Sequence, residues 1–227
     1  MKKLLLFNSL LLIFSCSWAQ EYKIDVSYMY LYSDQWDKAI HTYNFSRPFF
    51  TEKQPLLMNG LTTSISYIFK NKKHVKHGVN FAYAYFPSSA GNDNFNNKLN
   101  LHFVNLGYIL HYEKAETCKG LYSELLVSAT SSIVYRNVNG EPFVYDEKKS
   151  KAFGIGGELH LKVGYYYKLK NKIYLSPFIA VAYTPILYAP NHEAVINQTK
   201  GLTSNNWTGI ISTQIGITFH IRQQKND

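Results

Sequence analysis

Cysteine is almost absent from this chain, whose 227 residues include only Cys16 and Cys118. Cys16 lies inside an expected N-terminal export signal, so the processed chain would keep a single cysteine and could form no intrachain disulfide. An exported protein meets a compartment that permits disulfides. The fold must therefore be held together without a covalent staple.

Long apolar runs are also missing, except at the start of the chain. Lys2 and Lys3 precede an apolar segment, 4–14, that is too short to cross a bilayer as a helix, and small residues up to Ala19 suit cleavage by a signal peptidase. We expect a signal peptide over 1–19.

The remaining residues, 20–227, have a suitable length for one domain and contain no further segment of the ~20 apolar residues that a membrane helix needs. If this part lies in a membrane, it crosses as strands. Lipidation of Cys16 is an alternative to the plain signal, although Phe14 and Ser15 before it fit the lipidation pattern poorly.

What the chain does contain is strict alternation, and the clearest example is 153–167. Apolar or aromatic side chains such as Phe153 and Leu161 occupy almost all odd positions, whereas even positions hold glycine or ionisable residues such as Glu158 and Lys162. A period of two is the signature of a strand with one apolar and one polar face. In a soluble β-sandwich, the alternative reading, a second sheet would cover the apolar face.

The same alternation predicts eight strands, at 22–32, 61–69, 79–85, 99–112, 121–135, 153–167, 173–183 and 207–221. In the fourth segment, Leu101 and Phe103 break the pattern, and we expect a β-bulge there. An even number of antiparallel strands can close into a barrel, which leaves no unpaired edge in hydrocarbon. We therefore predict an all-β, eight-stranded, antiparallel up-and-down transmembrane β-barrel.

The connections between these segments alternate in length, as expected for an outer-membrane barrel. The short connections, expected to be periplasmic turns, are 70–77, 113–119 and 168–172. The longer ones, expected to be extracellular loops, are 33–57, 87–98, 136–151 and 185–206.

Aromatic residues sort to both ends of the predicted strands. Tyr30, Tyr83 and Trp207 fall at one rim, and Tyr67, Tyr167 and Phe219 fall at the other. Such belts form at the two head-group levels of a membrane. A soluble sandwich has no reason to sort its aromatic residues in this way.

With this pattern, the chain resembles the small eight-stranded outer-membrane barrels of Gram-negative bacteria, the group of the OmpA membrane domain and OmpX. The resemblance covers the whole processed chain down to the strand that ends at Ile221. It implies a porin-like fold and location in the outer membrane of the cell envelope. It carries no family motif and therefore transfers no functional residue.

The net charge of the chain is +9, or +7 without Lys2 and Lys3. The lysines of two predicted periplasmic turns together carry a charge of +7, equal to the net charge of the processed chain. They are Lys70, Lys72, Lys73, Lys76, Lys168, Lys170 and Lys172. One hypothesis is a basic rim against anionic phospholipid of the inner leaflet; the alternative is simple solvation of the turns. Nucleic acid is not an expected partner, because an exported barrel does not meet it.

Four inward-facing ionisable residues are predicted to form a polar cluster in the lumen: Glu124, Glu158, His160 and Lys162. Unpaired charges in a narrow interior are costly, so we expect these residues to pair, with Glu124 close to Lys162. Side chains nearly fill an eight-stranded barrel, so a continuous water channel is not expected.

The first long loop is unusually apolar, and its residues Trp36, Tyr43, Phe45, Arg47, Phe49 and Phe50 are candidate contact residues. They would contact either a partner protein of the envelope or the lipopolysaccharide surface; alternatively, the loop packs over the barrel mouth as a lid.

The main enzymatic alternative is a lipid A deacylase, which needs a serine activated by a histidine and a carboxylate. His160 and Glu158 share one strand face, and Ser128 and Ser132 lie on the neighbouring strand, but a structural hydrogen-bond network explains them as well. The remaining histidines, His111 among them, lack metal-ligand spacing and are read as loop or turn residues. We therefore expect a non-enzymatic barrel without a cofactor, with a structural or binding role through its extracellular loops, as an accessory subunit of an envelope complex or on its own.

Overall fold

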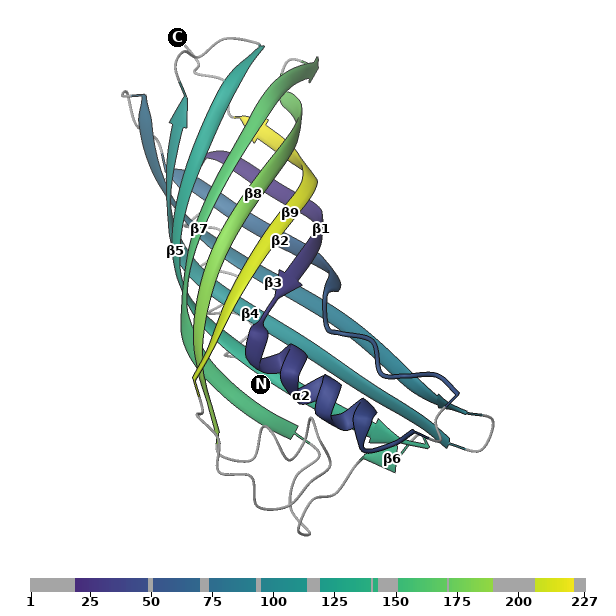
Figure 1. Ribbon diagram of the computed structural model, residues 1–227. Helices are drawn as coiled ribbons and strands as arrows, with labels where there is room; N and C mark the ends of the chain where they lie inside the picture. The colour runs from purple at the N-terminus through teal and green to yellow at the C-terminus, as the bar shows by residue number, and fades with distance from the viewer. Residues whose placement is uncertain are drawn as a thin grey trace, which may run out of the picture.

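The computed structural model describes residues 19–48, 51–69, 74–92, 95–113, 119–139, 141–142, 151–170, 172–189 and 207–222. Apart from Ala19, the predicted signal peptide lies outside these residues. The chain forms an antiparallel barrel with one helix (Figure 1). Its elements are β1 (Ala19–Tyr32), α2 (Asp34–Phe45), β2 (Asn59–Phe69), β3 (Val75–Asn92), β4 (Phe95–Glu113), β5 (Lys119–Val138), β6 (Glu141–Pro142), β7 (Lys151–Lys170), β8 (Ile173–Tyr188) and β9 (Trp207–Arg222).

The barrel closes because its first and last long strands pair, with Tyr22 opposite Ile221. The sheet order is β4-β3-β2-β1-β9-β8-β7-β5, and a further pairing of β4 with β5 completes the circle. β6 adds only two residues to the end of β5. The predicted eight-stranded, antiparallel up-and-down barrel is therefore confirmed.

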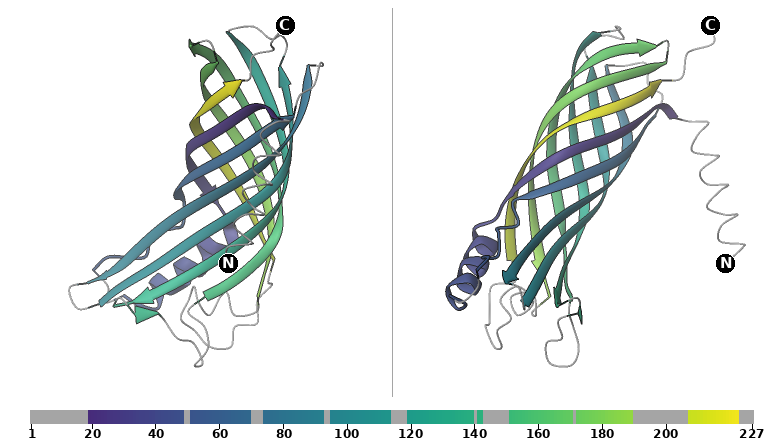
Figure 2. Two further views of the ribbon diagram at one scale, coloured as in Figure 1. Left: turned by 180° about the vertical axis from the view of Figure 1, so that it is seen from behind. Right: turned by 90° about the vertical axis from the view of Figure 1, so that its right-hand side faces the viewer.

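Glu21 of β1 pairs with Arg222 of β9, so both termini of the barrel lie at one end, here called the terminal end. The opposite end, where β3 joins β4 and β5 leads into β6, is called the loop end. Figure 2 shows the two ends from the side.

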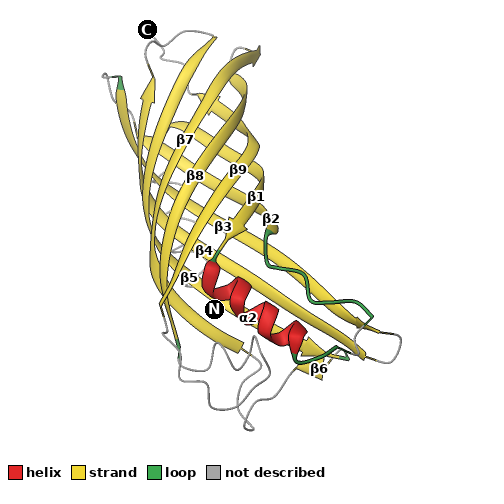
Figure 3. Ribbon diagram, viewed as in Figure 1, coloured by secondary structure: helices red, strands yellow, loops and turns green. Residues whose placement is uncertain are grey.

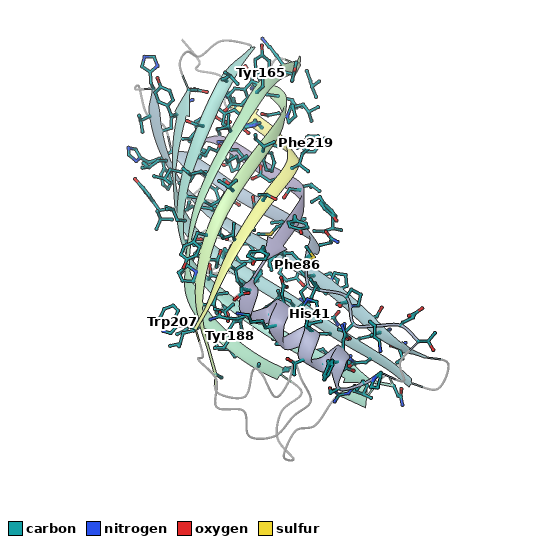
Figure 4. All side chains as sticks on the ribbon, viewed as in Figure 1. His41, Phe86, Tyr165, Tyr188, Trp207 and Phe219 are labelled. Atoms are coloured by element: carbon teal, nitrogen blue, oxygen red, sulfur yellow. The ribbon has the colours of Figure 1, made fainter. Side chains whose placement is uncertain are left out.

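The outer wall is apolar because alternate residues of every strand point away from the interior. On β7, for example, Phe153, Ile155 and Leu161 face outward and are about half exposed, whereas Glu158 and Lys162 are buried inside. Figure 4 shows Trp207 near the loop end and Phe219 nearer the terminal end, the two levels expected of aromatic belts. Such an exterior suits contact with acyl chains.

At the loop end, β3, β4 and β5 continue beyond the other strands (Figure 1). Asn92 still pairs with Phe95, and Asn97 still pairs with Val138, so the extension is regular sheet. Parts of the expected loops 87–98 and 136–151 are therefore strand, because these residues keep their ladder partners beyond the barrel.

The helix α2 lies within the expected loop 33–57 and runs along this extension (Figures 2 and 3). Asp34 and Asp37 in its first turn suit the positive end of the helix dipole. Its buried residues, Trp36, Ala39, Ile40 and Tyr43, follow helical spacing and form one face. The sequence predicts an apolar loop here, either a contact surface or a lid over the barrel mouth, and does not predict the helix. Among the described helical residues, no segment is long and apolar enough to cross a bilayer.

The expected bulge at Leu101 and Phe103 is wrong. The pairing of β3 with β4 continues without a shift through both residues, and both side chains are buried inside. They interrupt the polar face because the interior itself becomes apolar toward the loop end.

Candidate functional site

The terminal half of the barrel holds an ion-pair network, here called the central cluster: Lys23, Asp25, His111, Glu124 and Lys162. Lys23 forms an ion pair with Glu124, and His111 Nδ1 lies 2.8 Å from Glu124 Oε1. Lys162 Nζ lies 2.9 Å from Asp25 Oδ2 and 3.4 Å from Glu124 Oε2. Two carboxylates thus face two ammonium groups, so each buried charge has a partner of opposite sign.

A second network, the terminal cluster, closes the barrel toward the chain termini and consists of Glu21, Lys76, Glu113, His220 and Arg222. Lys76 pairs with Glu113, and Arg222 Nη2 lies 2.6 Å from Glu113 Oε2. Glu21 Oε2 forms an ion pair with Arg222 Nε at 3.2 Å, and Glu21 Oε1 lies 2.5 Å from His220 Nδ1. Here too, two carboxylates face two cations.

Tyrosines connect the two clusters. Tyr166 OH lies 2.9 Å from His111 Nε2, and its ring stacks edge-on against His220 with centroids 4.6 Å apart. The Arg222 guanidinium lies 4.4 Å from the centre of the same ring. This cation–π contact and the hydrogen bond join both clusters into one packed polar core.

Glu124 and Lys162, two of the four residues predicted for the lumen, are cross-strand partners in the central cluster. The other two lie one step nearer the loop end, where His160 Nδ1 is 3.8 Å from Glu158 Oε1. Glu158 Oε2 instead accepts from Asn105 Nδ2 at 3.0 Å and lies 3.3 Å from Thr184 Oγ1. The four residues thus fall into two neighbouring pairs.

A cavity of about 30 Å³ lies between these pairs and is lined in part by Asp25, Asn80 and His160. Asp25 Oδ1, Asn80 Oδ1 and His160 Nε2 have no hydrogen-bond partner among the described residues. A cavity of this size can hold about two water molecules, whose hydrogen bonds would satisfy such atoms.

Sequence reasoning missed most members of the two clusters. Lys23 and Asp25 stand on the inward face of the first predicted strand, so alternation could have placed them beside Glu124. His111 was read as a loop or turn residue, which is wrong because it is fully buried on β4. The available signal was alternation, because positions 105 and 111 are both odd and Asn105 faces inward on the same strand. Alternation could not predict the register that brings β1 and β4 to the same level in the barrel.

Lys76 does not belong to a surface rim, which corrects its predicted place. It is 2% exposed and lies inside β3 in the terminal cluster. Lys168 and Lys172 are exposed at the terminal end. Lys70, Lys72 and Lys73 lie outside the described residues, as does the side chain of Lys170. Among the described side chains, Lys168 and Lys172 fit the predicted basic rim, and Lys76 does not.

Toward the loop end the interior changes to an apolar plug, here called the mouth cluster. Its buried members come from the inward faces of the strands, from α2 and from the segment between α2 and β2: Met29, Leu31, Trp36, Ala39, Ile40, Leu57, Ala84, Phe86, Leu99, Leu101, Phe103, Val134, Ala152, Ile186, Tyr188 and Ile210. The Trp36 and Tyr188 rings lie 5.7 Å apart. Figure 4 shows Phe86 and Tyr188 in this region, beside α2.

Polar anchors fix α2 and the following segment to the extension. Asn97 Nδ2 donates to Tyr43 OH at 2.7 Å and to Gln54 Oε1 at 2.9 Å. Asn44 and Gln54 exchange two hydrogen bonds of 2.8 and 2.9 Å, and Gln54 Nε2 donates to Ser88 Oγ at 2.5 Å. Burial raises the pKa of Tyr43, so its hydroxyl stays protonated at neutral pH.

The predicted contact residues of the first loop divide accordingly. Trp36 and Tyr43 are each 1% exposed, so they serve the lid and offer no contact surface, which corrects their predicted role. Phe45 is 90% exposed at the end of α2, and Arg47 stacks on Tyr43 with 4.2 Å to the ring centre. Phe49 and Phe50 lie outside the described residues.

Among the described residues, the interior does not assemble a hydrolytic triad of Glu158, His160 and a serine. His160 Nε2 has no hydrogen-bond partner among the described residues, whereas a triad histidine must face the serine hydroxyl. Ser132 Oγ lies 2.7 Å from Tyr188 OH. No group of three or more potential metal ligands occurs among the described residues. The arrangement is suited to closing the barrel and to holding its strands in register.

Neither a protein-family model nor a curated protein matches this sequence. Among solved structures, the chain is similar to Neisserial surface protein A, with a TM-score of 0.51, 9% identity, and coverage of 89% of this chain and 96% of that one. It also matches OprG from Pseudomonas aeruginosa, at a TM-score of 0.45, 11% identity and coverage of 91% and 98%. Ail of Yersinia pestis matches with a TM-score of 0.41, 11% identity, and coverage of 88% of this chain and 98% of that one. At these identities the likeness concerns the fold, which is that of the small eight-stranded outer-membrane β-barrels.

Proposed function

We propose that the protein is a non-conducting outer-membrane barrel with a binding or structural role at its loop end. The observation that supports this most directly is the filling of the interior along its length. The charged clusters occupy the terminal half, and the mouth cluster with α2 occupies the other half. A barrel of this kind offers a rigid scaffold, and its contacts are made by what it presents outside the membrane.

The loop end is the part proposed to face the cell exterior. There, the β3–β4–β5 extension carries α2 on a hydrogen-bonded support, and α2 presents Gln35, Lys38, His41 and Phe45 to solvent. Phe45 is 90% exposed, so its ring is accessible to a partner at the end of α2. The proposed contact surface is this exposed face of α2, and its partner is another envelope component, of which the protein would be an accessory subunit.

Site-specific photocrosslinking tests this proposal in intact cells. A photoreactive phenylalanine analogue at Phe45 is expected to give a discrete adduct on irradiation, whereas the same analogue at the exposed terminal-end Lys168 is not. Deleting α2 would disturb the mouth cluster that it helps to form, so the experiment uses the full-length chain with a single substitution. Equal labelling at both positions, or none at Phe45, would refute the α2 surface.

A lipid A deacylase is the second candidate. It receives no support from the interior, where the cavity of about 30 Å³ beside Glu158 and His160 is far too small for an acyl ester. Lipid A mass spectra from cells with and without the protein should be identical. Loss of an acyl chain in its presence would favour the enzyme.

A further inference from the structure

The outer wall of the barrel is hollowed by a groove of about 650 Å³ near the loop end. Its sides and floor are formed in part by Val104, Leu106, Ala129, Ile155, Leu187 and Trp207, which come from five strands. The register explains the hollow, because Leu106 stands opposite Ala129 and Ala129 stands opposite Gly157. Small residues on β5 and β7 thus lie between larger side chains on either side.

Two neighbouring glycines on β7, Gly156 and Gly157, lie at the groove, and packing within the barrel requires only the first of them. A Cβ on Gly156 would lie 2.0 Å from Pro185 O, so the close approach of β7 and β8 needs this glycine. A Cβ on Gly157 would meet only Ser128 O, at the ordinary distance of 3.5 Å. The outer surface therefore leaves room at Gly157 that a side chain could have filled without strain.

Toward the loop end, the wall above the groove changes from apolar to cationic and polar. Asn100, Tyr135 and Lys151 form one cross-strand row, and the next row holds Lys98 and Asn137. Lys98 and Lys151 are both exposed, and Lys151 Nζ lies 5.3 Å from the centre of the Tyr135 ring. An amphiphilic surface results, with an apolar hollow below and two cations with hydroxyl and amide groups above.

We propose that this surface binds one phosphorylated, acylated glycolipid of the outer leaflet. An acyl chain lies in the groove, Lys98 and Lys151 bind phosphate, and Asn100 with Tyr135 contacts the sugar. Charge complementarity supports an anionic head group, and the groove continues the lipid-facing wall. Because the loop end carries these groups, the ligand is the glycolipid of the outer leaflet and not a phospholipid of the inner one. The inference rests on the proposed location in the outer membrane.

Native mass spectrometry of the folded full chain in detergent tests the site with three probes: bisphosphorylated lipid A, dephosphorylated lipid A and phosphatidylglycerol. The wild type should retain bisphosphorylated lipid A at least tenfold more strongly than either other lipid. Replacing both lysines by glutamine (Lys98→Gln, Lys151→Gln) should remove that preference. Filling the hollow with Ala129→Phe and, separately, Gly157→Leu should weaken retention of both lipid A forms.

Matched controls lie elsewhere on the wall. Thr213→Phe enlarges an outward side chain on β9, away from the groove, and Lys168→Gln with Lys172→Gln removes two exposed cations at the terminal end. Neither should change retention. Equal retention of all three lipids, tighter phosphatidylglycerol, or equal losses in the control variants would overturn the site. Folding is read separately from the heat-dependent gel mobility of each variant, so failure to insert into membranes contradicts the proposed location, whereas a folded barrel without lipid preference contradicts only this inference.

Discussion

Toward the chain termini the interior of the barrel is filled by ion pairs, whereas toward the long loops it is filled by apolar side chains and a helix. The terminal half holds its charges on strands that belong to the closed sheet, so no charged group can leave without opening the barrel. The loop half is closed partly by α2, which is joined to the wall by side-chain contacts. One barrel thus combines a cooperative closure with a closure that can open locally.

Glu124 gives the sharpest test of the cooperative half. Glu124→Ala leaves Lys23 and Lys162 without their shared carboxylate, and breaking a buried charge network in this way costs about 4 kcal/mol. Urea unfolding in lipid vesicles, followed by tryptophan fluorescence, should show this loss of unfolding free energy. A loss below about 1 kcal/mol would mean that the network contributes little.

Trp36 gives the corresponding test of the loop half. Trp36→Ala removes the largest side chain of the mouth cluster, which should weaken the docking of α2 by about 3 kcal/mol. Limited proteolysis should then cleave within 34–45 much faster, while the urea midpoint of the barrel stays nearly unchanged. If the barrel midpoint falls as far as it does in Glu124→Ala, the two halves are not separable.

Asn97 tests the polar anchor of the same lid with a smaller change. Asn97→Ala removes two hydrogen bonds and leaves Tyr43 OH and Gln54 Oε1 without this donor, at a cost of about 2 kcal/mol to α2 docking. Proteolysis should accelerate less than in Trp36→Ala. If Asn97→Ala is cleaved at the same rate as the wild type, apolar packing alone fixes α2.

Substitution of Lys38 should have the smallest effect on stability and serves as the matched control on α2. Its ion pair with Asp34, at 2.6 Å, is exposed on both sides, and such pairs contribute little. Lys38→Gln should leave both the proteolysis rate and the urea midpoint unchanged. A clear shift in either would show that exposed charges, and not the buried face, hold α2.

Alternation could predict the barrel because its signal is local: each residue's parity decides whether it faces in or out. The same rule placed Glu124 and Lys162 inside. It could not place Lys76, because a turn lysine and a strand lysine look alike until the end of the strand is known. Trp36, Ala39, Ile40 and Tyr43 carry helical spacing, but in a loop between strands that pattern was read as mere apolar content.

The terminal cluster was harder to predict than the central cluster. Glu21 and Arg222 meet because the first and last strands pair, and Glu113 joins them from the far side of the barrel. Such contacts depend on how the strands are staggered around the whole circumference, which no single segment records. Charge balance between these residues is therefore visible only in the folded chain.

Conductance across planar lipid bilayers tests most directly whether the barrel is closed along its length. The wild-type protein, inserted and shown to be folded, should give no stepwise current at either polarity, because the two charged clusters and the mouth cluster all have to open before ions pass. Regular current steps from the wild type would contradict this account.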